Sequence, residues 1–156
     1  MNHKVNVMVS LLCAYSTFFN VNVNAGQSRN VPDAIEQTEN IIKSLNMHIN
    51  NMKLPYFFAV PPKIETDLAW KMNVFRKGIH NLHQVLKHNI SYSHNVTLVK
   101  ENLNYVTNNC PPLHGHGTHG KIYDFQRVRA FLANLDHFLE ILYKENTCNS
   151  TTFQEK

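Results

Sequence analysis

The chain has 156 residues, of which 43% are hydrophobic and 17% charged, a composition typical of one globular domain. Its 15 lysines and arginines outnumber its 11 acidic residues and give a formal net charge of +4, but they form no run along the sequence, so we expect no nucleic-acid partner. The sequence has no glycine-rich phosphate loop and no apolar stretch close to the roughly 20 residues that span a bilayer. These features argue against nucleotide enzymes and proteins inserted in membranes.

Residues 1–25 have the pattern of a secretory signal peptide. Lys4 precedes an apolar segment without an acid, and Val23-Asn24-Ala25 ends it with a small residue. We predict cleavage after Ala25, which leaves a mature domain of residues 26–156 that is secreted to the extracellular space. Cleavage would also remove Cys13, so that Cys110 and Cys148 remain as an even pair that we expect to form a disulfide.

Three acceptor sequons for N-glycosylation support secretion. They begin at Asn89, Asn95 and Asn149. All three fall where we expect a loop or a tail, so we predict a secreted glycoprotein.

Four segments have the periodicity of amphipathic helices. Apolar residues recur mainly at steps of three and four over residues 33–53, 66–88, 95–109 and 123–145. In the second segment Gly78 should destabilise the helix by about 1 kcal/mol relative to Ala, unless a neighbour packs closely there. In the fourth, Phe125 begins the apolar stripe and Asp124 lies near the positive end of the helix dipole. No segment alternates with period two for long enough to build a sheet, although a short strand in each long connection is compatible with the sequence.

Connection lengths predict how these helices are arranged. Each helix has one apolar stripe and must bury it against the others, which predicts an all-α four-helix bundle. The second connection, residues 89–94, is short, whereas residues 54–65 and 110–122 are each long enough to run back along the bundle. This is the pattern of an up-up-down-down bundle with two long crossover connections. Cys110 and Cys148 end the third and fourth helices at one pole only in that topology, so the disulfide and the topology imply each other.

The sequence resembles the short-chain haematopoietic cytokines, the family of interleukin-3, interleukin-5 and granulocyte-macrophage colony-stimulating factor. The last helix, with Asp124-Phe125-Gln126-Arg127, Phe131-Leu132 and Leu135-Asp136-His137-Phe138-Leu139, is similar to that of mammalian interleukin-3. Asn73-Val74-Phe75 and Asn109-Cys110-Pro111-Pro112 resemble the corresponding region of interleukin-3 and granulocyte-macrophage colony-stimulating factor.

The cysteines leave the branch of the family open. Interleukin-3 typically pairs the cysteine after its third helix with one before its first helix, and no cysteine lies between Gly26 and Asn109. A cysteine after the last helix, like Cys148, is similar to granulocyte-macrophage colony-stimulating factor. We favour the interleukin-3 branch because of the last helix.

The resemblance implies a growth factor that stimulates the proliferation and differentiation of blood-cell progenitors. Such a ligand is not an enzyme, has no cofactor, and brings together a specific alpha receptor and a common beta receptor on the cell surface. A glutamate of the first helix would meet the beta receptor, for which we prefer Glu39 over Glu36. For the alpha receptor the resemblance points to the first crossover and the last helix, with Arg127, Asp136 and Glu140 as candidates. We expect a monomer.

A histidine-rich stretch is the main competing signal. Three imidazoles, His114, His116 and His119, could ligate zinc or copper, but flexible glycines separate them and no acid or thiolate is close. We therefore predict no metal site. Outside the cytokine class, the alternative is a secreted helical carrier or metal-binding bundle with an internal cavity. No set of residues predicts an enzyme.

Overall fold

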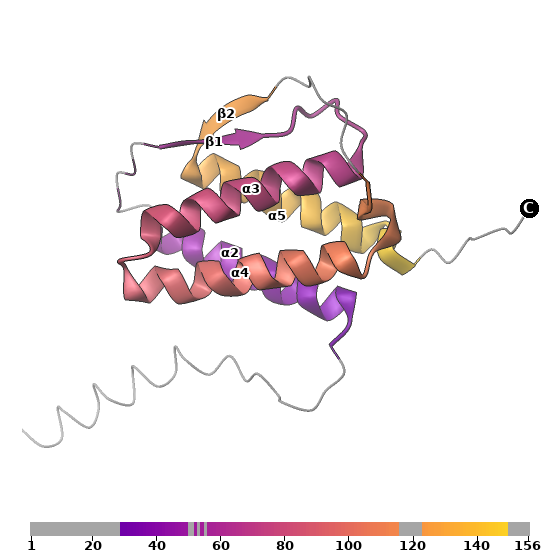
Figure 1. Ribbon diagram of the computed structural model, residues 1–156, viewed down its shortest axis with the longest axis horizontal. Helices are drawn as coiled ribbons and strands as arrows, with labels where there is room; N and C mark the ends of the chain where they lie inside the picture. The colour runs from indigo at the N-terminus through magenta and orange to yellow at the C-terminus, as the bar shows by residue number, and fades with distance from the viewer. Residues whose placement is uncertain (1–28, 50–51, 53, 55, 116–122, 150–156) are drawn as a thin grey trace, which may run out of the picture.

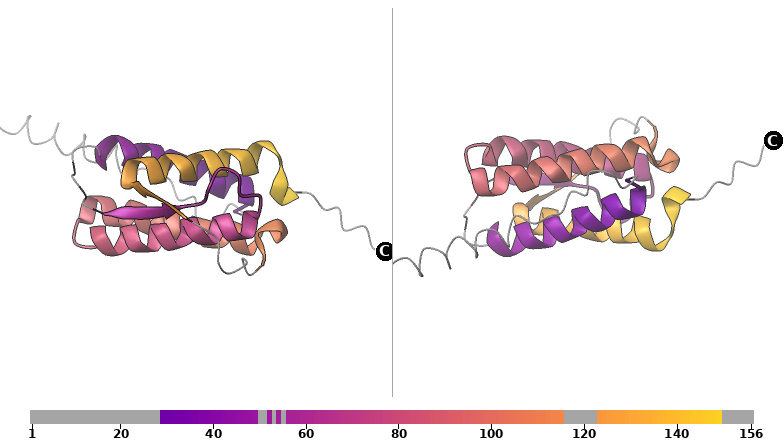
Figure 2. Two further views of the ribbon diagram at one scale, coloured as in Figure 1. Left: turned by 90° about the horizontal axis from the view of Figure 1, so that it is seen from above. Right: turned by 90° about the horizontal axis from the view of Figure 1, so that it is seen from below.

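The computed structural model describes residues 29–49, 52, 54, 56–115 and 123–149, and these residues are mostly helical (Figure 1). The four helices are α2 (Val31–Ile49), α3 (Leu68–Leu86), α4 (Ile90–Asn108) and α5 (Val128–Lys144). In the views of Figure 2, α2 lies beside α5 and α3 beside α4 on opposite sides of the molecule, and α2 also packs against α4, which joins the two pairs. The prediction of a mostly helical protein whose helices pack together is confirmed for the described residues.

The helices bury the apolar stripes that the sequence predicts. Among the described stripe residues, Ile42, Leu45, Met72, Ile79, Val99, Leu103, Leu132, Leu135 and Leu139 are each at most 1% exposed. Since none of these helices could be stable alone, burial of the shared stripes is what holds the four together. Helix α3 is capped by Asp67, whose side chain accepts a hydrogen bond from the backbone N–H of Trp70 at 2.9 Å.

Three helix boundaries differ from the prediction by more than two residues. Helix α2 ends at Ile49 rather than residue 53, and α4 begins at Ile90 rather than residue 95. The start of α5 at Val128 overturns the assignment of residues 123–127 to that helix. Phe125 has helical spacing to Val128, but it lies in a strand and is 67% exposed, and Asp124 lies in the same strand.

The two long connections meet in a small antiparallel ribbon. Strand β1 (Phe57–Val60) lies in the first connection and β2 (Asp124–Arg127) in the second, with Phe57 opposite Arg127 and Val60 opposite Asp124. Phe58 and Val60 point inward and are buried, whereas Phe57 on the alternate face is exposed. The ribbon lies across α3 and α5 at the top of Figure 1.

An aromatic cluster joins the ribbon to the helices beneath it. The Phe131 ring of α5 stacks on Phe58 of β1 at a centroid distance of 5.2 Å and lies 6.0 Å from Phe75 of α3. Gly78 lies directly beside this cluster, because a methyl group on its Cα would overlap the Phe131 ring. The sequence analysis required a closely packed neighbour to explain Gly78, and that neighbour is Phe131.

The predicted disulfide is present. Cys110 follows α4 and Cys148 follows α5, and their Cα atoms lie 4.6 Å apart. Cys110 is fully buried and belongs to the core, next to the short 3₁₀ turn η1 (Pro111–Leu113), while Cys148 lies in a second turn, η2 (Thr147–Asn149). The bridge therefore fastens the end of one helix pair to the end of the other.

The predicted signal peptide, together with His116 and His119, lies outside the described residues. Of the helices that are described, none combines the length and apolarity that crossing a membrane requires.

Candidate functional site

Four of the five predicted receptor-binding residues gather on the surface shared by α2 and α5. Glu36 and Glu39 come from α2, while Asp136 and Glu140 come from α5. We call these four residues the acidic face. The other three are all close enough to Glu39 to affect the charge on its carboxylate. The two glutamates of α2 lie more than 90 positions before the two acids of α5 in the sequence. The packing of α5 against α2 brings them together.

Glu39 is partly buried at the centre of this face. Burial raises the pKa of its carboxyl group above the usual value, and the negative charges of Asp136, Glu140 and Glu36 raise that pKa further. Only Lys43, one helical turn along α2, lowers it. The acidic face therefore carries negative charge that its own lysine does not fully balance.

Asp136 is in a similar environment. Burial raises the pKa of its carboxyl group, and the neighbouring charge of Lys43 opposes that shift. Its Oδ1 atom is buried and has no hydrogen-bond partner in the described part of the chain. A buried carboxylate oxygen without a donor is unfavourable, so this atom adds to the energetic cost of the acidic face.

Glu140, at the edge of the acidic face, has partners of its own. Lys144 Nζ donates a hydrogen bond to Glu140 Oε1 one helical turn away, and this bond lowers the pKa of the Glu140 carboxyl group. His137 Nδ1 lies 3.7 Å from the other carboxylate oxygen. The negative charge of Glu140 is thus balanced by neighbouring groups more fully than that of Glu39.

Arg127, the fifth predicted residue, lies elsewhere. It is the last residue of β2 rather than part of the helix, and its guanidinium lies over the exposed ring of Phe57 at 5.3 Å from the centroid. Nine residues separate it from Asp136, which corresponds to about 14 Å along a helix axis. The predicted residues therefore form two sites and not one.

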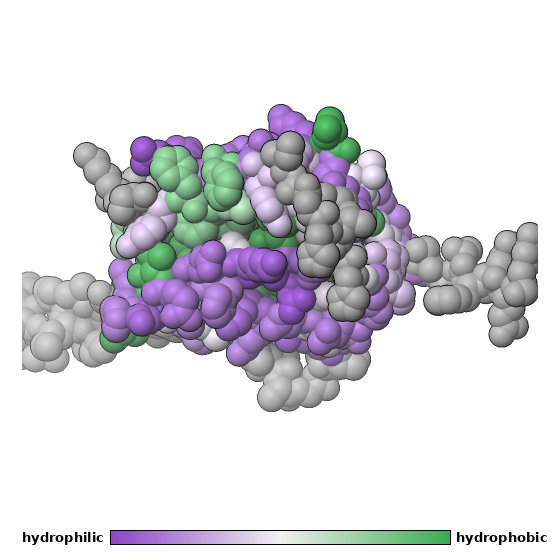
Figure 3. All heavy atoms as spheres, turned by 45° about the horizontal axis from the view of Figure 1, so that its top comes forward, coloured by the Kyte–Doolittle hydropathy of each residue, from purple (hydrophilic) through white to green (hydrophobic). Residues whose placement is uncertain are grey.

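The outer face of the ribbon is apolar around Arg127. Phe57 is 59% exposed and Phe125 is 67% exposed. Across the ribbon Phe57 pairs with Arg127, and Ala59 pairs with Phe125, so these side chains lie on the same face. Figure 3 shows apolar side chains gathered over this part of the molecule above a band of hydrophilic ones. Trp70, in contrast, is buried and stacks on Tyr123, as expected for a packing residue.

The sequons occupy different environments. Asn89 precedes α4 and Asn149 is exposed after α5. Asn95 does not lie in a loop, as we had expected, but within α4 and only partly exposed. The loop expectation was wrong there because α4 begins earlier than its apolar stripe.

Sequence reasoning missed one further feature, a groove between α3 and α4 with a volume of about 480 Å³. Arg76, Lys77 and Lys100 contribute to its lining, and no acidic residue does. The signal in the sequence was the absence of any acid from residues 68–86. It was overlooked because the basic residues come from two helices and form no run.

Comparison with known proteins adds no assignment. No protein-family model matches the chain, and no match is found among curated proteins or solved structures. Within the described ranges, no group of three or more histidines, cysteines, aspartates or glutamates could hold a metal ion.

Proposed function

We propose that this protein is a secreted haematopoietic cytokine resembling interleukin-3, which acts by joining a specific alpha receptor to a common beta receptor. The observation that carries the proposal is the acidic face. The resemblance offered Glu39, with Glu36 as second choice, for the beta receptor, and Asp136 and Glu140 for the alpha receptor. Because all four residues lie on one surface shared by α2 and α5, we assign that whole surface to the beta receptor and keep Arg127 on the ribbon for the alpha receptor. A cytokine related to granulocyte-macrophage colony-stimulating factor is the alternative within the family.

An up-up-down-down topology is part of this proposal. The 4.6 Å between the Cα atoms of Cys110 and Cys148 supports it, because parallel α4 and α5 bring these two residues to the same pole. The colour gradients in Figure 1 also favour it, since α2 and α3 run toward one side and α4 and α5 toward the other. Residues 87–89, which join α3 to α4, are too few for anything but antiparallel neighbours.

Glu39 has the electrostatics that a beta-receptor contact needs. Its carboxylate is partly desolvated and repelled by three other acids, so a cationic side chain from a receptor would relieve repulsion as well as form an ion pair. Both effects favour binding of a basic surface over an acidic one.

The ribbon is the proposed alpha-receptor contact on the first crossover. Phe57 and Phe125 supply exposed aromatic area, and Arg127 supplies a charge held over the Phe57 ring. Aromatic and arginine side chains are the residues that most often dominate binding energy at protein interfaces. The ribbon and the acidic face are separate, so one ligand could contact two receptor chains.

The interior argues against the carrier alternative. The Phe131 ring fills the space between α3 and α5 so closely that Gly78 has no room for a methyl group. The groove between α3 and α4 is open to solvent and is lined by seven polar residues and two apolar ones. An apolar ligand would need an enclosed apolar cavity instead.

The proposal is tested by binding the secreted, deglycosylated protein to soluble interleukin-3 and granulocyte-macrophage alpha receptors of the same species. We expect binding to the first. Binding only to the second would select the alternative branch, and binding to neither by a helical, disulfide-bonded protein would contradict the proposal.

A charge-reversal pair tests the beta-receptor contact. Glu39→Arg should keep the fold and alpha-receptor binding but remove growth stimulation of receptor-bearing cells. Glu101→Arg makes the same charge change at an exposed position of α4 and should signal normally. A normal dose response for Glu39→Arg would exclude Glu39 from the receptor contact.

A further inference from the structure

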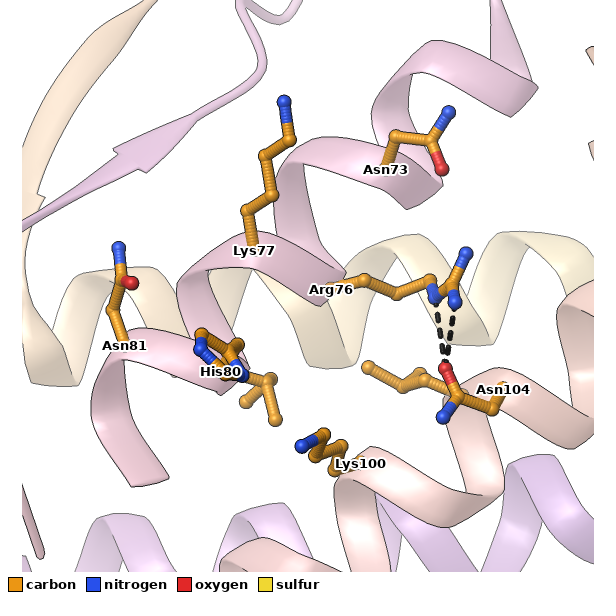
Figure 4. A pocket seen from close by; sticks show the side chains of 9 residues that line it. Asn73, Arg76, Lys77, His80, Asn81, Lys100 and Asn104 are labelled. Carbon is orange, nitrogen blue, oxygen red and sulfur yellow. Dashed lines mark hydrogen bonds between the residues drawn. The ribbon is translucent and has the colours of Figure 1, made fainter. Parts of the chain in front are cut away.

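The groove between α3 and α4 concentrates positive charge in a shape that can hold an extended ligand. Arg76, Lys77 and His80 line it from α3 and Lys100 from α4 (Figure 4). Neither Lys77 nor Lys100 forms an ion pair with any described residue, and no acid lines the groove. Arg76 and Lys100 face the gap between the two helices, and the side chain of Lys77 extends from the other side of α3, so the positive charge continues across that helix.

Arg76 is held in place by a neutral partner. Its Nε and one terminal nitrogen donate hydrogen bonds to Asn104 Oδ1 at 3.0 and 2.7 Å, so the guanidinium spans from α3 to α4. Figure 4 shows this bridge, with the side chains of His80 and Lys100 directed toward one another in the same gap. Because Asn104 is uncharged, it fixes the orientation of Arg76 without neutralising it.

We propose that this groove binds the sulfated polysaccharide chains found outside cells. The inference rests on the proposed secretion of the protein, because such chains are its surroundings there. Sulfate groups would pair with Arg76, Lys77 and Lys100, and the amides of Asn73, Asn81 and Asn104 can hydrogen-bond sugar hydroxyls. Asn73 and Asn81 are eight residues apart on α3, so the groove extends over about 12 Å, longer than a single sulfate group.

The lining favours a polysaccharide over a nucleic acid. Proteins that bind single-stranded nucleic acids stack the bases on aromatic side chains, and the groove contains no Phe, Tyr or Trp. Its apolar lining residues are Ile79 and Leu103, which belong to the core stripes and form the floor of the groove.

Matched double variants of the full secreted protein test the groove on immobilised heparin. Lys77→Gln with Lys100→Gln removes two groove charges, and Lys63→Gln with Lys87→Gln removes two exposed charges outside it. We expect the groove variant to lose about tenfold in affinity and the control to stay within about twofold, with binding weakened by salt. Equal losses in both variants, or none in either, would overturn the proposal.

Two further measurements, of RNA binding and of alpha-receptor binding, show which part of the proposal is wrong if it fails. If single-stranded RNA bound as tightly as heparin and lost affinity in the same variant, the assignment of the ligand would be wrong. The groove variant should keep its binding to the alpha receptor, because Lys77 and Lys100 lie on neither the ribbon nor the acidic face. Groove-dependent heparin binding by a protein that binds neither alpha receptor would refute the cytokine proposal and leave the groove in place.

Discussion

The two helix pairs of this bundle share one core but carry opposite charge on their outer surfaces. Helix α2 has three acidic residues and one lysine, and it packs against α5 to form the acidic face. Helix α3 has three basic residues and no acid, and it packs against α4 to form the basic groove. A formal net charge of +4 conceals this division, since it averages two surfaces that would attract different partners.

The two surfaces also differ in how their charges are balanced. On the acidic face, burial and then the neighbouring carboxylates raise the pKa of Glu39, so charge is concentrated there at some cost to the fold. In the groove the cations are spread around an open volume, and the charged group of Arg76 is fixed by an amide. Neither arrangement is required to fill the core.

Removing the disulfide should have the largest effect on stability, because the bridge joins α4 of the basic pair to α5 of the acidic pair. It closes a loop of 38 residues, and replacing Cys110 and Cys148 with Ser should lower the free energy of unfolding by about 4 kcal/mol. Urea unfolding of the two proteins measures the difference. A loss below about 1 kcal/mol would mean that helix packing alone holds the two pairs together.

Receptor binding and heparin binding can both be measured in that cysteine variant under conditions where it remains folded. The acidic face and the groove each lie within one helix pair, so receptor and heparin binding should both survive. Loss of receptor binding alone would show that the bridge, and not packing between α2 and α5, positions the acidic face.

A methyl group at Gly78 should have the next largest effect, because this residue is where α3 of the basic pair meets α5 of the acidic pair. Helix propensity alone predicts that Gly78→Ala stabilises the protein by about 1 kcal/mol. The added methyl would overlap the fully buried Phe131 ring, which Phe58 and Phe75 hold in place. We therefore expect a net loss of roughly 1 to 3 kcal/mol, measured by thermal or urea unfolding.

Two controls separate packing from propensity. Gln84→Ala changes an exposed position of the same helix and should alter stability by less than about 0.5 kcal/mol. Combining Gly78→Ala with Phe131→Leu should cost less than the sum of the two changes, since the smaller side chain makes room. Stabilisation by Gly78→Ala would show that the two pairs are not in close contact here.

The sequence predicted the helices well wherever an apolar stripe marks them. Leu45, Met72 and Leu139 were all assigned to stripes and are all buried. The boundaries failed where the stripe does not reach the helix end. In α4 the first buried residue is Val96, so nothing in residues 90–95 indicates the earlier start.

Non-local pairing explains the other errors. Phe125 has the right spacing for the α5 stripe, but β2 pairs with β1, whose partner residues lie more than 60 positions earlier in the chain. Local periodicity cannot detect such a partner. The candidate site behaves in the same way, because Glu39 and Asp136 could be chosen individually but their proximity depends on how α2 packs against α5.

The smallest expected effect isolates the electrostatic cost of the acidic face. The pKa of Glu39 is raised in the folded protein, so the fold binds more protons than the unfolded chain near the usual pKa, and stability falls as the pH rises through that window. Glu39→Gln removes the repelled charge and should raise the free energy of unfolding at pH 7. The gain should be less than about 1 kcal/mol, because solvent screens the repulsion at this partly exposed site. That gain should vanish as the pH falls below the usual pKa of a glutamate, where Glu39 is protonated in both states.

Glu101→Gln, on an exposed site of α4, is the control and should change stability by less than about 0.5 kcal/mol at either pH. If Glu39→Gln instead destabilised the protein at neutral pH, Glu39 would be an internal ion-pair partner of Lys43 and not a charge available to a receptor.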